Sequence, residues 1–596
     1  MAHPQDSAAH TESRHFGSVK DTLESIVVAF ILAFVFRAFL LEAFVIPTGS
    51  MATTLYGQQI THTCTTCGFE YARGITPEEV ITAHRSPAWS ITLRCPNCDT
   101  MDDQFAAEQI RQPDSGDRIL IWKWAYDIGY EATGPQRWDV AVFKNPSNAT
   151  DNYIKRLVGV PGEVLQIIDG DIYAAKLETL QQDDPDLAAD FIRITDELNT
   201  QREESNGRYV SRDFLEAYAD LNQRILPHLR IRPKTERAQE ALWFNVYDHN
   251  FLPTPTTTGQ ARSPVGWDPV DEAAAEAWKT RSREVTFAST DERHLAIRFA
   301  GKPITDYMAY NFGPRQDQSE RAEYAVGDIR LRFVWMPEAG DGSLQIASNR
   351  DLDAFVAEIH MDGTVTLERI DARLPGGRRT LDERRLPRPL RAGKTYDIKW
   401  LNVDHRARLL IDGQEVVSTN DENYHPDLPR RLAVSRGQAD DVRPTEVRIA
   451  ARRLQCTLRH LRLDRDVYYR SSIQTEQNAP HPVTGEPQSN PFYGWPGWGT
   501  AGMPIFLRPE REVDGRIYPG EYFALGDNSP NSKDSRRWWQ IGPQLHYLGA
   551  GYQLGTVPHD QLVGKSFFVY WPAGYRPTTT GNIGLIPNVG KMRWIR

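Results

Sequence analysis

The stretch 37-RAFLLEAFVIPTGSM-51 decides how the chain is arranged, because it leads from the only apolar run of membrane length into a turn. That run, residues 23–41, has 19 residues, and at roughly 1.5 Å per residue a helix of this length spans about 28 Å, close to one hydrocarbon core. Pro47 and Gly49 then rule out continued helix and favour an extended or tightly turned backbone. Since no cleavage site of the A-x-A type follows, we predict an uncleaved transmembrane helix at 23–41 that presents the Ser50 hydroxyl close to the membrane.

The composition is that of a largely globular protein. With 596 residues, the chain is long enough for several domains. Charged residues make up 25% and hydrophobic residues 40% of it, so most of the chain is expected outside the membrane. The net charge of -10 and the lack of a basic stripe argue against a nucleic-acid partner. Residues 1–22 are polar, and we predict a disordered tail there.

Two C-x2-C pairs follow the turn and flank a short β-like segment, residues 89–94. This pattern is typical of a zinc ribbon, in which four thiolates surround a tetrahedral metal. Such a site is structural, since four thiolates leave no open coordination position for catalysis. Two disulfides are the alternative if the compartment is oxidising. We predict a knuckle at 62–100 that holds structural zinc through Cys64, Cys67, Cys95 and Cys98.

A lysine lies within an apolar, β-rich run at residues 153–163, which contains a Pro-Gly turn near its end. A lysine in a strand usually faces solvent and pairs with an acid. If Lys155 points inward instead, burial lowers its pKa and makes the neutral amine available as a general base. Strands are predicted at 119–127 and 140–144, and a polar loop rich in Gly, Asp, Asn and Ser at 526–536.

The central part of the chain changes character twice. Residues 174–283 are charged and helix-permissive, with loops between the helical stretches. From 284 to 470, strand follows strand with alternating apolar residues and Asp-Gly turns at 362–363 and 412–413, which predicts a β-sandwich. Its layout resembles the concanavalin-like jelly rolls of lectins and laminin-G modules, which implies either a carbohydrate or protein ligand or a scaffold without a sugar site. Residues 471–515 are predicted to form a linker.

Five segments, taken in order, resemble the bacterial type I signal peptidases, the membrane-bound serine/lysine leader peptidases. They read RAFLLEAFVIPTGSM, GDRILI, RWDVAVFKNP…YIKRLVGVPGE, GDNSPNSKDSR and LVGKSFFVYWP, and cover roughly residues 23–57, 116–173 and 516–572. The resemblance implies a mainly β protein with a catalytic core in two parts, 42–173 and 516–596, anchored by one N-terminal helix. The β-sandwich would be an insertion in that core, and we expect it to stand apart from the catalytic cleft.

The resemblance also implies a catalytic dyad, with Ser50 as nucleophile and Lys155 as general base. Lysine can act in this way only if burial takes its pKa about 3 units down from roughly 10.4. Ser532 would hydrogen-bond the lysine amine, and the Thr48 hydroxyl would join the Ser50 amide in the oxyanion hole. Catalysis would need no cofactor. The residues that match the family's loop are Gly526, Asp527, Asn528, Asp534 and Arg536, and the candidates for two shallow substrate pockets are Ile46, Leu55, Val142 and Ile154.

By this resemblance we expect a signal peptidase I, a serine endopeptidase that removes signal peptides from secreted preproteins after small residues. Its partners would be these signal peptides and the lipid bilayer. It would cross the inner cell membrane once, with the catalytic part on the extracytoplasmic side. Two alternatives stay open: a serine/lysine membrane peptidase with a narrow client, and a membrane-anchored binding protein on a peptidase-derived scaffold. The joint presence of Ser50, Lys155 and Ser532 argues against the second alternative.

Overall fold

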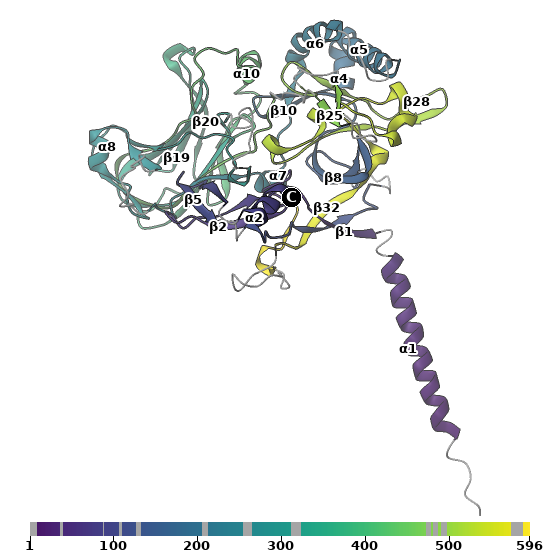
Figure 1. Ribbon diagram of the computed structural model, residues 1–596. Coiled ribbons are helices and arrows are strands. Elements are labelled where there is room, and N and C mark those ends of the chain that lie inside the picture. The colour runs from purple at the N-terminus through teal and green to yellow at the C-terminus, as the bar shows by residue number, and fades with distance from the viewer. Residues whose placement is uncertain are drawn as a thin grey trace, which may run out of the picture.

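The computed structural model shows a β-rich body from which helix α1 (Ala9–Val35) projects (Figure 1). The body contains antiparallel sheets of eight, four and 13 strands and several two-stranded hairpins, so the predicted mainly β class is confirmed. The residues that the structure describes are 9–35, 40–86, 89–106, 110–126, 133–204, 212–253, 265–311, 323–471, 478–480, 487–489, 497–573 and 588–596.

Helix α1 begins inside the segment predicted to be disordered. Residues 9–22 are helical, while residues 1–8 lie outside the described residues. No proline interrupts this stretch, and each residue added to an existing helix gains one hydrogen bond, so the helix propagates upstream. Among the described residues, no helix is long and apolar enough to cross a membrane. Of the predicted transmembrane segment, residues 36–39 lie outside the described part.

The eight-stranded sheet draws its strands from both predicted parts of the core. A C-terminal strand, β32, lies between β6 and β7, and β30 pairs with β8, so the two parts form one sheet. Across the sheet the strands are β1 (Leu41–Val45), β6 (Arg118–Trp122), β32 (Leu562–Trp571), β7 (Val140–Asn145), β8 (Asn148–Gly159), β30 (Glu521–Leu525) and β31 (Val557–Pro558), with β33 (Arg593–Trp594) beside β32.

The four-stranded sheet packs with helices around one apolar core. Its strands are β11 (Arg230–Ile231), β10 (Asp171–Lys176), β9 (Glu163–Ile168) and β27 (Ile505–Leu507), and the helices gathered beside it in Figure 1 are α4 (Leu177–Asp183), α5 (Pro185–Glu204) and α6 (Arg212–Ile225). Phe191 of α5 and Leu221 of α6 are buried in the same cluster as Leu165 of β9. Strand β27 lies within 471–515, where we predict a linker, because three residues are too short for a recognisable pattern.

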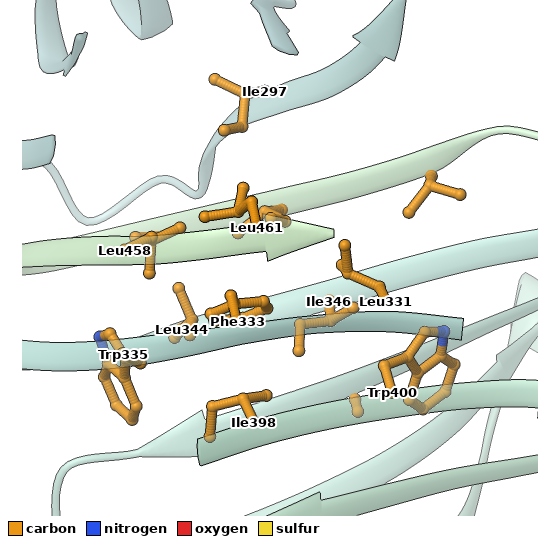
Figure 2. Packing of buried hydrophobic residues seen from close by; sticks show 14 of the residues in the cluster. Ile297, Leu331, Phe333, Trp335, Leu344, Ile346, Ile398, Trp400, Leu458 and Leu461 are labelled. Carbon is orange, nitrogen blue, oxygen red and sulfur yellow. The ribbon is translucent and has the colours of Figure 1, made fainter. Parts of the chain in front are cut away.

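The 13-stranded sheet folds over on itself around a second apolar core, which confirms the predicted β-sandwich. Its two long strands, β17 (Ile329–Arg350) and β24 (Val447–Arg465), pair along most of their length, with register shifts at which they bend. The first half of β17 pairs with β21 (Tyr396–Val403) and the second half pairs with β18 (Asp353–His360). The two halves of β17 therefore belong to two layers. Trp335 of β17 and Trp400 of β21 pack in the core between them (Figure 2).

The sheet is larger than the sequence pattern predicts. Three strands lie upstream of residue 284, in the stretch predicted to be helical and loop, and are too short to show alternation. The remaining strands are β12 (Phe244–Asp248), β13 (Gly266–Pro269), β14 (Trp278–Lys279), β15 (Val285–Ser289), β16 (Leu295–Ala300), β18 (Asp353–His360), β19 (Thr364–Ile370), β20 (Arg378–Arg385), β21 (Tyr396–Val403), β22 (Arg406–Ile411) and β23 (Gln414–Ser418). The helices of the same part of the chain are α7 (Glu236–Ala241), α8 (Glu272–Ala277) and α10 (Leu428–Ser435).

A group of buried charges joins the sandwich to the four-stranded sheet. Arg350, at the end of β17, lies 2.6 Å from both Asp171 of β10 and Asp328, and 3.1 Å from Asp169. These four side chains are at most 9% exposed, and buried charges are stable only when they are paired. These ion pairs join the sandwich to the four-stranded sheet, while each of the two keeps its own apolar core. Sequence patterning misses the contact because these residues are far apart in the chain and each reads as a surface charge.

A small unit lies between β1 and β6. It consists of two hairpins, β2 (Gln59–Thr63) with β3 (Glu70–Gly74) and β4 (Ser90–Arg94) with β5 (Met101–Ala106), and of helix α2 (Pro77–Arg85) between them. Its apolar core includes Ala309, which belongs to the 3-10 turn η3 (Ala309–Asn311) of the segment between β16 and β17. The unit therefore touches the insertion.

Candidate active site

Two elements bring Ser50 and Lys155 together. Strand β1 ends at Val45, and the turn after it carries Ser50, while Lys155 lies on β8 opposite Ala141 of β7. Lys155 Nζ lies 2.7 Å from Ser50 Oγ and donates a second hydrogen bond of 2.9 Å to the Ile154 carbonyl. Lys155 is 4% exposed, whereas Ser50 is half-buried. The lysine therefore points inward to the serine, and the serine hydroxyl stays within reach of a substrate.

Burial changes the protonation of the lysine. Loss of solvation on burial lowers the pKa of Lys155 to about 8, and the nearby positive charge of Arg536 lowers it further. The carboxylates of Asp534 and Asp527 act in the opposite direction and raise this pKa, but by less than burial lowers it. A group with such a pKa is neutral in a substantial fraction of molecules near neutral pH. The amine beside Ser50 Oγ can thus accept a proton from the hydroxyl.

The predicted loop is held by two buried ion pairs. Asp527 accepts hydrogen bonds of 2.8 and 2.7 Å from Arg156, next to Lys155 on β8. Asp534 accepts bonds of 2.8 and 2.6 Å from Arg536 and one of 3.1 Å from the Gly526 N–H. Although burial raises the pKa of Asp534, Arg536 more than offsets it, so the pKa is lowered and the carboxylate stays charged. These pairs fix the loop beside the lysine.

Asn528 links this loop to the turn that carries the serine. Its backbone N–H donates to the Ser50 carbonyl at 3.1 Å, and its side-chain amide donates to the Gly49 carbonyl at 2.9 Å. Thr54, further along the turn, donates a bond of 2.6 Å to Asp527. The turn is thus tied to the loop by bonds on both sides of Ser50.

The structure places Ser532 differently from the prediction. The hydrogen bonds of Lys155 go to Ser50 and Ile154, and in the described part of the chain the buried Ser532 hydroxyl has no hydrogen-bond partner. It lies against the backbone of Gly526, where an added Cβ would be 2.3 Å from Ser532 Oγ. The predicted bond to the lysine is therefore absent. A sequence motif gives the position of a hydroxyl but not its rotamer.

The groups expected at the oxyanion hole are accessible. The Thr48 side chain is exposed. In the described residues, the Ser50 N–H donates to no other protein group. Both donors are therefore free to meet a substrate oxygen.

The candidate pocket residues form a closed cluster. Ile46, Leu55 and Val142 are at most 3% exposed in one apolar cluster, and the partly buried Ile154 packs against it. They lie under the site as core, and their role in substrate binding stays a prediction. A cavity of about 190 Å³ lies instead on the sandwich, among Asp248, Asn250, Arg332, Phe333, Val334, Asp397, His460 and Arg462.

The four knuckle cysteines lie together. Their sulfur atoms are all within 4.8 Å of one another, and the Sγ atoms of Cys64 and Cys98 are 3.6 Å apart and those of Cys67 and Cys95 3.7 Å apart. These distances exceed the S–S bond length of about 2.05 Å and match the edge, roughly 3.8 Å, of a tetrahedron with metal–sulfur bonds of about 2.3 Å. The Asn97 N–H, 3.4 Å from Cys95 Sγ, adds a donor to one sulfur. The arrangement fits a four-thiolate site and does not fit two disulfides.

Sequence reasoning missed three residues beside the site: Tyr310, Asn311 and Arg156. Arg156 follows Lys155 directly in the YIKRLVGVPGE motif, and this position next to the candidate base could have identified it as a site residue. Tyr310 and Asn311 come from the insertion, in an ordinary loop sequence, and carry no signal of their own.

A serine hydroxyl beside a buried lysine amine is the arrangement of the serine/lysine peptidases. The comparison with known families agrees, because the model described as "Signal peptidase, peptidase S26" matches residues 109–211 and 470–571. The family model thus matches two segments of the chain, and the sandwich lies between them. The match includes α4 and α5, which we predict as part of the insertion. Ser50 lies outside the matched residues, so its place in the site rests on the geometry.

Two curated relatives show how far the similarity extends. A "Signal peptidase I" of Pseudomonas fluorescens is 42% identical over 79 residues, which are 11% of this chain and 28% of that protein. A "Signal peptidase I" of Rickettsia bellii is 27% identical over 165 residues, 28% of this chain and 42% of that protein. The chain thus spans less than half the length of these relatives.

Solved structures resemble the chain only weakly. A carbohydrate-binding module from Bacillus subtilis covers 34% of this chain and 96% of its own, with 11% identity and a TM-score of 0.22. A galectin from Caenorhabditis elegans covers 23% of this chain and 83% of its own, with 16% identity and a TM-score of 0.15. Similarities this low assign no ligand to the sandwich.

Proposed function

We propose that the chain is a signal peptidase I, a membrane-bound endopeptidase that removes signal peptides from secreted preproteins after small residues. The observation that carries the proposal is the 2.7 Å distance between the buried Lys155 Nζ and Ser50 Oγ. The match of two segments to the signal peptidase family supports the substrate class. A dyad of this kind needs no cofactor, because the lysine supplies and takes up the proton itself.

In the proposed reaction, Lys155 acts as the base and Ser50 as the nucleophile. Neutral Lys155 takes the proton of the Ser50 hydroxyl as Oγ attacks the scissile carbonyl. The Ser50 N–H and the Thr48 hydroxyl stabilise the oxyanion, each donor being worth about 3 kcal/mol of barrier. The lysine ammonium then protonates the leaving amine. In the second half, neutral Lys155 takes a proton from a water molecule whose oxygen attacks the acyl-enzyme carbonyl. As the bond between the acyl carbon and Ser50 Oγ breaks, the lysine ammonium returns the proton to Oγ and the acid product leaves.

The surface of α1 supports attachment to a membrane. Nine large apolar side chains on it are 45–66% exposed: Leu23, Ile26, Val27, Val28, Phe30, Ile31, Leu32, Phe34 and Val35. Exposed apolar area is unfavourable in water by about 25 cal/mol per Å², so this surface is stable against lipid. In the proposal the chain crosses the inner membrane once, the catalytic sheet lies on the extracytoplasmic side, and the substrate's apolar segment shares the bilayer.

The test is cleavage of a model preprotein in detergent. Lys155→Ala and Ser50→Ala are each expected to lower the rate by a factor on the order of 1000, because the hydroxyl loses its base or is itself removed. Lys533→Ala is the matched control, since Lys533 is an exposed lysine of the polar loop 526–536, which lies beside Lys155. This variant should cleave the preprotein like the wild type. Full activity of folded Lys155→Ala would exclude the dyad.

A further inference from the structure

A segment of the insertion runs along the active-site turn. This strap, residues 306–311, lies between β16 and β17 and ends in η3. Arg470 Nε donates a bond of 2.6 Å to Asp306, and Arg465 donates bonds of 3.2 and 3.1 Å to the carbonyls of Asp306 and Tyr307. Tyr307 donates a bond of 2.7 Å to the Arg94 carbonyl of the knuckle. The start of the strap is therefore anchored on two sides.

The end of the strap contacts the loop beside the serine. Asn311 and Asn528 exchange two hydrogen bonds, from Asn311 Nδ2 to Asn528 Oδ1 at 2.6 Å and from Asn528 Nδ2 to Asn311 Oδ1 at 2.7 Å. Asn528 Nδ2 also donates to the Gly49 carbonyl at 2.9 Å, and Asn528 is fully buried. An amide nitrogen has two protons, so this side chain uses both, and its orientation is set by the pairing with Asn311.

Tyr310 closes the other side of the turn. A Cβ at Gly49 would lie 2.0 Å from Tyr310 Cε1, so the ring packs directly on the glycine before Ser50. The Tyr310 ring is 5.7 Å from that of Tyr56, and its hydroxyl donates to the Gln58 carbonyl at 3.3 Å. The turn from Gly49 to Gln58 is thus held between the strap and the polar loop.

We infer that Asn311 is a positioning residue of the active site, which acts through Asn528 on the backbone of Gly49 and Ser50, and that the insertion thereby completes the site. Asn311 has no contact with the reacting atoms and takes no part in the proton transfer. Its effect is on the place of Ser50 Oγ relative to Lys155. The inference rests on the proposed function, because the position of Ser50 Oγ affects a rate only if Ser50 is the nucleophile.

The size of the effect follows from the geometry that a reaction needs. A misplacement of about 1 Å can lower a rate by roughly 100-fold. Asn311→Ala removes both bonds to Asn528, so we expect kcat to fall by about 10- to 100-fold while KM for a signal-peptide substrate stays close to that of the wild type. The apparent pKa of the rate should not move, since the surroundings of Lys155 are unchanged.

The experiment uses the full chain in detergent with a short signal-peptide substrate. Asn420→Ala is the matched control, because Asn420 is an exposed asparagine of the insertion. In the described part of the chain its side chain accepts hydrogen bonds from the backbone N–H groups of Glu422 and Asn423 alone, within its own turn. If Asn311→Ala fails to fold, Asn311→Asp serves instead: the side chain keeps its shape and its acceptor but loses the donor to Asn528. Because the new carboxylate oxygen faces Asn528 Oδ1, another acceptor, we expect kcat to fall at least as far as in Asn311→Ala.

A double-mutant cycle with Asn528→Ala separates positioning from a general loss of stability. If Asn311 acts through Asn528, the double variant should be no slower than Asn528→Ala alone. An unchanged kcat in folded Asn311→Ala, a change in KM alone, or additive losses in the cycle would each overturn the inference. No cleavage by the wild type or the Asn420→Ala control would instead count against the proposed function.

Discussion

At the scale of single residues, the protonation of Lys155 sets the pH dependence. Its pKa is lowered to about 8 by burial. Only the neutral amine accepts the serine proton, so kcat/KM should rise as the pH passes about 8 and level off above it. The measurement is a pH–rate profile of the detergent-solubilised protein, checked for stability at each pH. An optimum in acid, near about pH 5, would contradict the assignment of the base.

Ser532 permits a second prediction at this scale. Its buried hydroxyl has no hydrogen-bond partner in the described residues and only helps to lower the pKa of Asp534, so it contributes little to stability. Ser532→Ala should therefore unfold at the same temperature as the wild type or slightly above it. If the hydroxyl turns to the lysine when substrate binds, kcat falls by about 10-fold, far less than in Lys155→Ala. A large loss of thermal stability would show that the hydroxyl is bonded in the resting protein.

At the scale of elements, the knuckle is expected to hold one zinc ion per chain through Cys64, Cys67, Cys95 and Cys98. Elemental analysis of purified protein measures it, and Cys67→Ser should lower the content. Because Tyr307 of the strap bonds the knuckle, removal of the metal with a chelator should reduce activity together with thermal stability. Protein without metal, whose cysteines react with an alkylating agent only after reduction, would show disulfides instead.

Local patterns predict some of these elements and miss others for physical reasons. Alternation indicated β18, β19 and β21, and the apolar run around Lys155 indicated β8. The second half of β17 follows a stretch, PEAGDGS at 337–343, that reads as a turn, yet bulges carry the strand through it. The contact of Asn311 with Asn528 joins residues 217 positions apart, and no local sequence pattern at either residue predicts this contact. Ser50 and Lys155 were found because the motifs around them are long.

At the scale of the whole molecule, the buried charges around Arg350 join the insertion to the catalytic part. Arg350→Met leaves three carboxylates without their common partner, so we expect the free energy of unfolding to fall by about 3–5 kcal/mol. Urea unfolding measures the change. Arg298→Met is the control, since Arg298 is 54% exposed on β16 and 4.0 Å from Glu446. Equal midpoints for the two variants would mean that the charges do not hold the parts together.

The order of strands in the eight-stranded sheet bears on when the protein becomes active during its synthesis. Strand β32, which separates β6 from β7, leaves the ribosome more than 400 residues after β7. The turn with Ser50 and the strand with Lys155 are thus made early but have no completed sheet between them until the sandwich has folded and the last strand has arrived. A growing chain halted before β32 should therefore carry both Ser50 and Lys155 and cleave no substrate.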